Sequence, residues 1–307
     1  MTNKTATYKK ALLMKISGLY FIISGITPVF APILWELKRT MPAELVLIIG
    51  MGLPLVFQLV LLLALLHRYN LWYFSGLKRT NIQSIILMIP LIALIYPFIL
   101  FISRLCEYLI PHNTLIISVN TQSVLHSIGP IGGFLVLAVC PAIVEELVFR
   151  GFIFGTLRNR SFIAAAVLST LGFSLSHGNF EQAVYTGLLG FALCSVREIT
   201  GSVFPCIFAH TLFNSVSVFS IYCASSVNDE LDAVTQLDTT IPPEIFLVLN
   251  HRLLIISMFG LMLLLLVYAL LMKCNSFVYD RSKDKEYPAI TVTYIIGFAV
   301  RIFLNMI

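Results

Sequence analysis

The sequence predicts an all-α polytopic membrane protein with about eight transmembrane helices. Hydrophobic residues make up 58% of the 307 residues, charged residues make up only 11%, and the mean hydropathy is +0.92. Together these values exclude a soluble globular domain. Because each span needs about 20 apolar residues, the chain has room for these helices, short loops and little else. We therefore expect residues 1–307 to form a single membrane domain.

Apolar runs of spanning length alternate with short polar segments along the whole chain. A final run at 289–307 is either a ninth span or, as we prefer, an interfacial helix with Arg301 at the lipid headgroups. The eight predicted spans are 12–35, 45–66, 84–102, 129–157, 162–177, 182–196, 203–222 and 253–272.

The distribution of Lys and Arg predicts the orientation in the membrane. With eight spans and the N-terminus inside, 13 of the 20 basic residues fall in inside loops and 4 in outside loops. Since cytoplasmic loops carry the excess of positive charge, both termini are predicted to be cytoplasmic. We find no internal repeat and no matched pair of broken helices, which disfavours a transporter.

The formal charge of +5 does not indicate a nucleic-acid partner. The basic residues are scattered over several loops, with no dense run and no base-stacking aromatic residues beside them. Membrane topology explains this charge better. The expected partners are the lipid bilayer and a membrane-associated peptide or protein substrate, with lipidated substrates among the candidates.

The most informative stretch is PAIVEELVFRGFIFGTLR at 141–158, which places two carboxylates and an arginine in an apolar run. A charge at the bilayer centre costs about 3 kcal/mol or more, so such residues indicate a functional site by default. Glu146 and Arg150 are four residues apart and are predicted to form an ion pair on one helix face. Glu145 points elsewhere and is left free for chemistry. The alternative is that the whole cluster is a structural clamp between helices.

Three polar residues in later spans complete the candidate site. Glu145 and His177 are equally distant from Ser161, so a helical hairpin that turns there brings the two to similar depth. They could then share one water molecule. His210 and Asn214 are four residues apart and project from the same face of the seventh span. The sequence therefore predicts a buried active site between spans 4, 5 and 7, within a catalytic core at 129–222.

This set of residues favours peptide hydrolysis in the membrane. Glu145 would take a proton from a water molecule that His177 orients, and the resulting hydroxide would attack the amide carbon. His210 and the Asn214 amide would stabilise the negative charge on the carbonyl oxygen. Glu146 and Arg150 would support the helix.

A second chemistry also uses these side chains. Glu145, His177 and His210 could be three zinc ligands with an open fourth position. The HExxH spacing typical of many zinc peptidases is absent from the sequence. We therefore prefer direct activation by Glu and His, with no cofactor, and keep zinc as the alternative.

Four short motifs within 129–220 resemble the motif series of the CAAX prenyl protease type II family, also called CPBP intramembrane proteases. The motifs are EELVFR, the FSLSH histidine followed by Gly178 and Asn179, the TGS turn at 200–202, and HTLFN. Their order, spacing and membrane setting make the match specific. The resemblance implies an eight-helix fold with a glutamate-dependent endopeptidase site. It assigns Glu145, His177, His210 and Asn214 to the catalytic positions and Glu146 and Arg150 to supporting ones.

The resemblance also shapes the expected location and the competing hypotheses. Family members outside eukaryotes are linked to bacteriocin processing or immunity rather than to known prenylated substrates. We expect an integral protein of a prokaryotic plasma membrane that cleaves a membrane-associated substrate. The main alternative is a non-enzymatic immunity or scaffold protein of the same family, and a transporter comes third.

Overall fold

The computed structural model describes Gly18 and residues 41–69, 75–109, 128–158, 161–177, 180–225 and 242–277. Every regular element within these ranges is a helix, which confirms the all-α prediction. Apart from Gly18, the predicted first span at 12–35 lies outside the described residues. The segment 289–307 lies outside them as well, so neither of these two predictions is tested.

The helices of the described part follow the second to eighth predicted spans. The second and third spans correspond to α3 (Ala43–Tyr69) and to α4 (Ile82–Ile86) with α5 (Met88–Leu109). The fourth is the continuous helix Ile128–Leu157, which contains η3 (Phe134–Val139), α7 (Cys140–Glu146), η4 (Leu147–Ile153) and α8 (Phe154–Leu157). The remaining helices are α9 (Phe162–Leu175), α10 (Phe180–Thr200), α11 (Phe204–Ser225) and α12 (Pro243–Cys274).

Three described helices are long and apolar enough to cross a membrane, judged by length and composition. They are Ile82–Leu109, Ile128–Leu157 and Pro243–Cys274, with 28, 30 and 32 residues. The last begins at Pro243 rather than at the predicted Leu253, because the helix continues through the polar pair His251–Arg252. Proline suits the first turn of a helix, where its missing N–H is not needed. Shorter apolar helices occupy Gly52–Arg68, Phe162–Leu175 and Phe204–Ser220.

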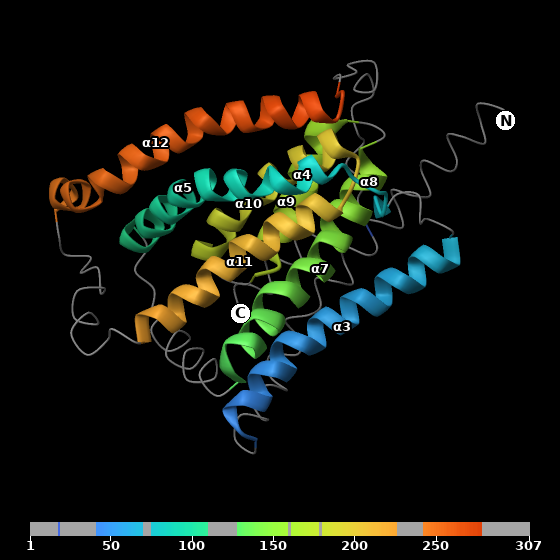
Figure 1. Ribbon diagram of the computed structural model, residues 1–307. Helices are drawn as coiled ribbons and strands as arrows, with labels where there is room; N and C mark the ends of the chain where they lie inside the picture. Colours follow the sequence, from blue (N-terminus) through green and yellow to red (C-terminus); the bar gives the residue numbers. More distant parts are fainter. Residues whose placement is uncertain are drawn as a thin grey trace.

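The helices pack as a bundle in which α12 and α3 lie at opposite edges (Figure 1). One buried cluster joins α3, the segment from α7 to α8, and α9. A second joins α5, α10, α11 and α12. The backbones of α5 and α12 approach closely, since a Cβ added at Gly260 would lie 2.5 Å from the carbonyl oxygen of Leu94. The helix that carries the two adjacent glutamates belongs to the first cluster and also packs against α11 of the second.

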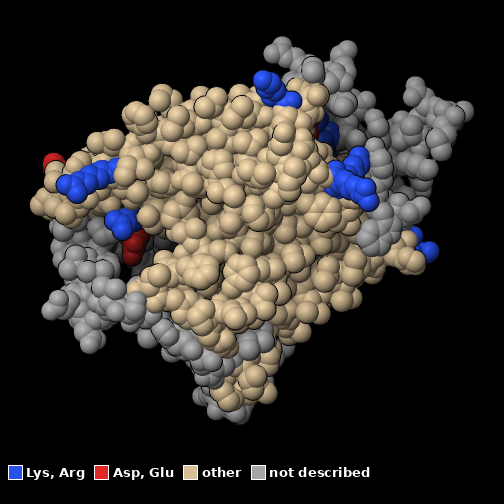
Figure 2. Space-filling view, viewed as in Figure 1, with Lys and Arg blue, Asp and Glu red and all other residues tan. Residues whose placement is uncertain are grey.

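The outer face of α12 is apolar and exposed. Leu247, Val248, Leu249, Leu265 and Leu266 are all more than half exposed on it. Figure 2 shows Lys and Arg at the margins of this face of the molecule, with a broad uncharged surface between them. A surface of this kind, together with helices of spanning length, is what an integral membrane protein presents to lipid.

The segment 75–80 before α4 is anchored to the turn between α10 and α11. The Ser202 hydroxyl donates to the Lys78 carbonyl at 2.8 Å, and the Val203 N–H donates to the Gly76 carbonyl at 2.9 Å. Gly76 has a φ of +68° and lies directly against the Arg197 guanidinium, so a side chain there would be strained and would clash. This anchor fixes the start of the third span relative to the helices that carry the site.

Candidate active site

Two π-helical segments flank the short α-helix that carries Glu145 and Glu146. η3 ends at Val139, α7 runs from Cys140 to Glu146, and η4 begins at Leu147. A π-helix has i→i+5 hydrogen bonds and more residues per turn than an α-helix, and π-segments often mark functional sites. Arg150 lies in the first turn of η4, directly after the end of α7 at Glu146.

The predicted ion pair between Glu146 and Arg150 is present and fully buried. Arg150 Nη1 donates to Glu146 Oε1 at 2.7 Å, and both side chains are 0% exposed. The guanidinium also lies over the ring of Phe173, with Cζ 4.3 Å from the ring centroid. A buried pair of this kind is stable only while both partners remain.

His210 contacts both glutamates, through different nitrogens. Its Nδ1 lies 2.9 Å from Glu146 Oε1, and its Nε2 lies 3.8 Å from Glu145 Oε2. Because a carboxylate accepts hydrogen bonds, Nδ1 carries the hydrogen and donates it to Glu146. Nε2 is then the nitrogen that faces Glu145 and the cavity. Glu146 therefore supports a histidine as well as pairing with Arg150. The sequence did not predict this contact with His210.

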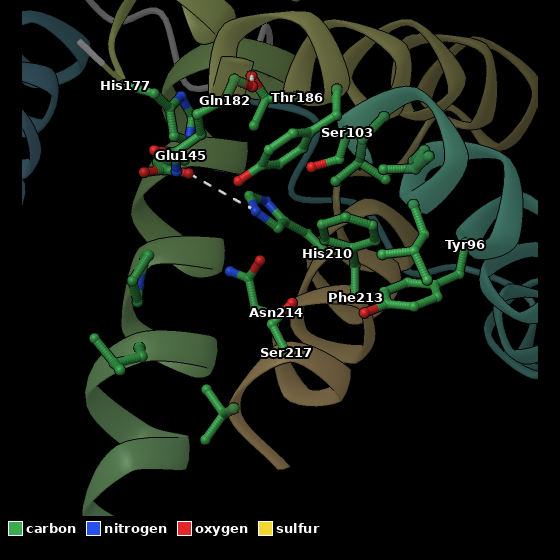
Figure 3. Close-up of a pocket in the computed structure, with 17 residues that line it drawn as sticks. Tyr96, Ser103, Glu145, His177, Gln182, Thr186, His210, Phe213, Asn214 and Ser217 are labelled. Carbon is green, nitrogen blue, oxygen red and sulfur yellow. Dashed lines mark hydrogen bonds and ion pairs between the residues drawn. The ribbon is translucent and has the colours of Figure 1, made fainter. Parts of the chain in front are cut away.

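His177 is oriented by its own helix. Its Nδ1 lies 2.8 Å from the Phe173 carbonyl oxygen, which can only accept, so Nδ1 is the donor and Nε2 is left without that hydrogen. Figure 3 shows His177 beside Glu145, and the two interact electrostatically. The hairpin between α8 and α9, capped by the Ser161 side chain, thus brings Glu145 and His177 together.

All four predicted catalytic residues line one cavity of about 410 Å³. Glu145 enters from α7, His177 from the end of α9, and His210 and Asn214 from successive turns of α11 (Figure 3). The Glu145 side chain is 17% exposed, whereas that of His210 is 3% exposed. Glu146 and Arg150 lie behind this wall and do not line the cavity.

Two helices that the sequence analysis did not connect with the site complete the cavity. α5 lies outside the predicted core at 129–222. The residues that these helices add include Tyr96 and Ser103 from α5, and Gln182, Tyr185 and Thr186 from α10. Each is an uncharged polar residue among many apolar ones, a weak signal in isolation. The usable signal was spacing, since 96 and 103, or 182 and 186, share one helix face.

The described residues contain no group of three or more His, Cys, Asp and Glu side chains placed to hold a metal ion. The Nδ1 atoms of His177 and His210 are already engaged, with a carbonyl and with Glu146. Metal-binding histidines typically donate one ring N–H to a carbonyl or carboxylate and bind through the other nitrogen, so these contacts suit either chemistry, and we derive no step through a metal.

The segment that carries the motifs and the site geometry also matches known proteins. Residues 127–216 match the Rce1-like family. The matching description is "Type II CAAX prenyl endopeptidase Rce1-like". All of the predicted catalytic and supporting residues lie within this match, and the resemblance read from the sequence motifs is confirmed.

A curated relative points the same way. The chain is 28% identical over 103 residues to the "Putative membrane peptidase YdiL" of Bacillus subtilis (strain 168). This alignment covers 33% of the present chain and 42% of that relative, so less than half of the relative's length is matched. No solved structure matches the chain. At the family level, both findings support a membrane-bound protease.

Proposed function

We propose that this protein is an intramembrane endopeptidase that hydrolyses a peptide bond of a membrane-associated substrate. The observation that carries the proposal is the convergence of Glu145, His177, His210 and Asn214 on one cavity between apolar helices. Ionisable groups are costly in a membrane and are retained there for function. A scaffold does not need a half-buried carboxylate beside two histidines.

Glu145 and His177 activate the water molecule in this proposal. The Nε2 atom of His177 is a hydrogen-bond acceptor, so it orients a water molecule by accepting one of its hydrogens. Glu145 takes the other proton while the water oxygen attacks the carbonyl carbon of the substrate. When the tetrahedral intermediate collapses, the C–N bond breaks and the amine leaves with the proton that Glu145 had taken. Atoms and charge then balance, and the enzyme returns to its starting state.

His210 and Asn214 stabilise the oxyanion. Since Nδ1 of His210 already donates to Glu146, donation toward the cavity requires a hydrogen on Nε2 as well. In this role His210 donates through both nitrogens, and the carboxylates of Glu146 and Glu145 lie 2.9 Å and 3.8 Å from them. The Asn214 amide, one helical turn later, supplies a second and neutral donor.

The setting favours a substrate that is itself held in the membrane. The cavity is walled by helices of the apolar bundle, and its lining combines hydroxyl and amide groups with apolar side chains. A soluble peptide would have to leave water to reach Glu145. Lipidated and transmembrane peptides are the candidate substrates.

The test is a cleavage assay on membrane-anchored peptides with the purified full-length chain in detergent, with mass spectrometry to locate the cut. Glu145→Gln should reduce turnover by about 100- to 10,000-fold while the variant remains folded. The matched control is Glu244→Gln, the same change at an exposed position in the first turn of α12 that does not line the cavity. Near-parental turnover by Glu145→Gln would remove Glu145 from the mechanism. Absence of cleavage by the parent, across peptides that insert in the membrane, would favour the non-enzymatic alternative.

A further inference from the structure

Phe173 occupies the centre of the polar cluster, although its own side chain is apolar. It lies on α9 one turn before His177 and is 0% exposed. It does not line the cavity, so it does not meet substrate. Its ring nevertheless contacts three of the charged or titratable side chains of the site.

These contacts use different parts of the ring. The Arg150 guanidinium lies over the ring face, with Cζ 4.3 Å from the centroid, which is cation–π geometry. The rings of His177 and His210 stand nearly perpendicular to it, at 85° and 89°, with centroids 4.9 Å and 5.5 Å away. Perpendicular packing is a favoured arrangement of neighbouring aromatic rings.

Each histidine needs this contact because one hydrogen bond does not fix a ring. His177 is held at Nδ1 by the Phe173 carbonyl, and His210 is held at Nδ1 by Glu146. A ring tied at one atom can still tilt about that bond and carry Nε2 away from the cavity. Packing against Phe173 removes this freedom for both rings at once.

Arg150 depends on the same ring. Its Nη1 pairs with Glu146, while Nε and Nη2 are buried and have no hydrogen-bond partner among the residues that the structure describes. The ring face of Phe173 is thus the additional favourable contact that the structure shows for this buried cation. Because Arg150 pairs with Glu146, and Glu146 accepts the hydrogen bond of His210, the contact of Phe173 with Arg150 also influences the position of His210.

We propose that Phe173 is a positioning residue that aligns His177 and His210 for catalysis and couples their alignment to the Arg150–Glu146 pair. This proposal rests on the proposed peptidase function for its kinetic consequence. Its structural content, the alignment of two histidine rings, does not depend on that function.

The first test compares Phe173→Leu with Phe154→Leu in the full-length chain. Both phenylalanines are buried in the same cluster and make ring contacts, but Phe154 packs on Phe162, away from the histidines. Because misplacement of catalytic groups by about 1 Å can cost 100-fold, Phe173→Leu should lower kcat by about that factor. KM should stay within about twofold, because Phe173 does not touch substrate. Phe173→Tyr keeps the ring and should recover most of the lost kcat. Equal losses in Phe173→Leu and Phe154→Leu would overturn the proposal.

The second test needs no substrate. Carbethoxylation of His177 by diethyl pyrocarbonate, mapped by mass spectrometry, reports how freely its ring exposes Nε2. The rate should change from the parental value in Phe173→Leu and stay parental in Phe154→Leu. An unchanged rate in Phe173→Leu would overturn the proposal. If the parent cleaves no peptide, the peptidase proposal fails and this readout still decides the role of Phe173. Should Phe173→Leu not fold, Phe173→Met compared with Phe154→Met takes its place.

Discussion

The two nitrogens of His210 face two different carboxylates, and this arrangement gives the adjacent glutamates distinct roles. Glu146 is fully buried and is engaged by both Arg150 and His210. Glu145 is partly exposed to the cavity and lies at a longer distance from His210. A carboxylate with two buried partners is suited to hold a geometry, whereas one that faces a cavity is suited to exchange a proton with water.

The buried Arg150–Glu146 pair should matter far more for stability than the half-buried Arg158–Glu198 pair. Arg150→Ala leaves Glu146 buried with an uncompensated charge, which costs about 3–5 kcal/mol. Arg158 and Glu198 are 14% and 15% exposed and remain within reach of water, so Arg158→Ala should cost less than Arg150→Ala. Thermal unfolding of the detergent-purified variants measures the difference. Equal stability of Arg150→Ala and the parent would show that the buried pair has no structural role.

Asn214 provides a prediction about the transition state. Asn214→Ala should lower kcat by about 100- to 1,000-fold with a much smaller change in KM, because an oxyanion donor acts mainly after attack has begun. Asn250→Ala is the matched control, since Asn250 is buried on α12, where it hydrogen-bonds Arg104 and the Phe246 carbonyl outside the cavity. It should reduce stability and leave kcat near the parental value.

Asn214 and His210 also distinguish the water-activation mechanism from the zinc alternative. An amide is a good neutral donor and an unusual zinc ligand. In the zinc alternative, His210→Ala would strip the metal, and a strong chelator would silence the parent reversibly. Stoichiometric zinc that is lost in step with activity would replace the water-activation mechanism and leave the peptidase proposal standing.

At the scale of helices, the interruption of regular α-helix at the glutamates is what sequence patterns did not predict. The i,i+4 spacing predicted the Glu146–Arg150 pair. The equal distance of Glu145 and His177 from Ser161 predicted the hairpin that brings these two residues together. Neither pattern distinguishes α from π winding, because the apolar residues of η3 and η4 suit both. The second contact of Glu146 was missed because it joins residues 64 apart in the sequence, from two different helices.

Gly190 on α10 leaves the space that Arg150 fills. A Cβ at this position would lie 3.0 Å from Arg150 Nη2, 3.2 Å from Thr170 Cγ2 and 3.3 Å from Phe173 Cδ1. Gly190→Ala should therefore destabilise the protein by about 1–3 kcal/mol through overpacking, and should reduce turnover by displacing the cluster.

A second glycine is the control for this prediction. Gly52 lies inside α3 with nothing within 4 Å of an added Cβ, so Gly52→Ala should be neutral or stabilise the protein by up to about 1 kcal/mol. Thermal unfolding and turnover of the two variants are the measurements. If Gly190→Ala matched Gly52→Ala in both, α10 would not constrain Arg150.

At the scale of the molecule, composition was sufficient to predict helices in a membrane, and hydropathy placed most of them. The exact ends were harder to predict, as α12 shows, because a polar pair inside a helix looks like a loop when neighbouring helices are unknown. The composition of the cavity was harder still. Tyr96, Ser103 and Tyr185 belong to none of the four motifs in the sequence, and only the packing of α5 and α10 brings them to the site.

The central claim is that Glu145 and His177 activate one shared water molecule, and a double-mutant cycle tests it most directly. Each of Glu145→Gln and His177→Ala should reduce turnover by about 100-fold or more in the membrane-peptide assay. Groups that act as a unit are not additive, so the double variant should be hardly slower than the more impaired single variant. Additive losses, or near-parental turnover by either single variant, would contradict the account.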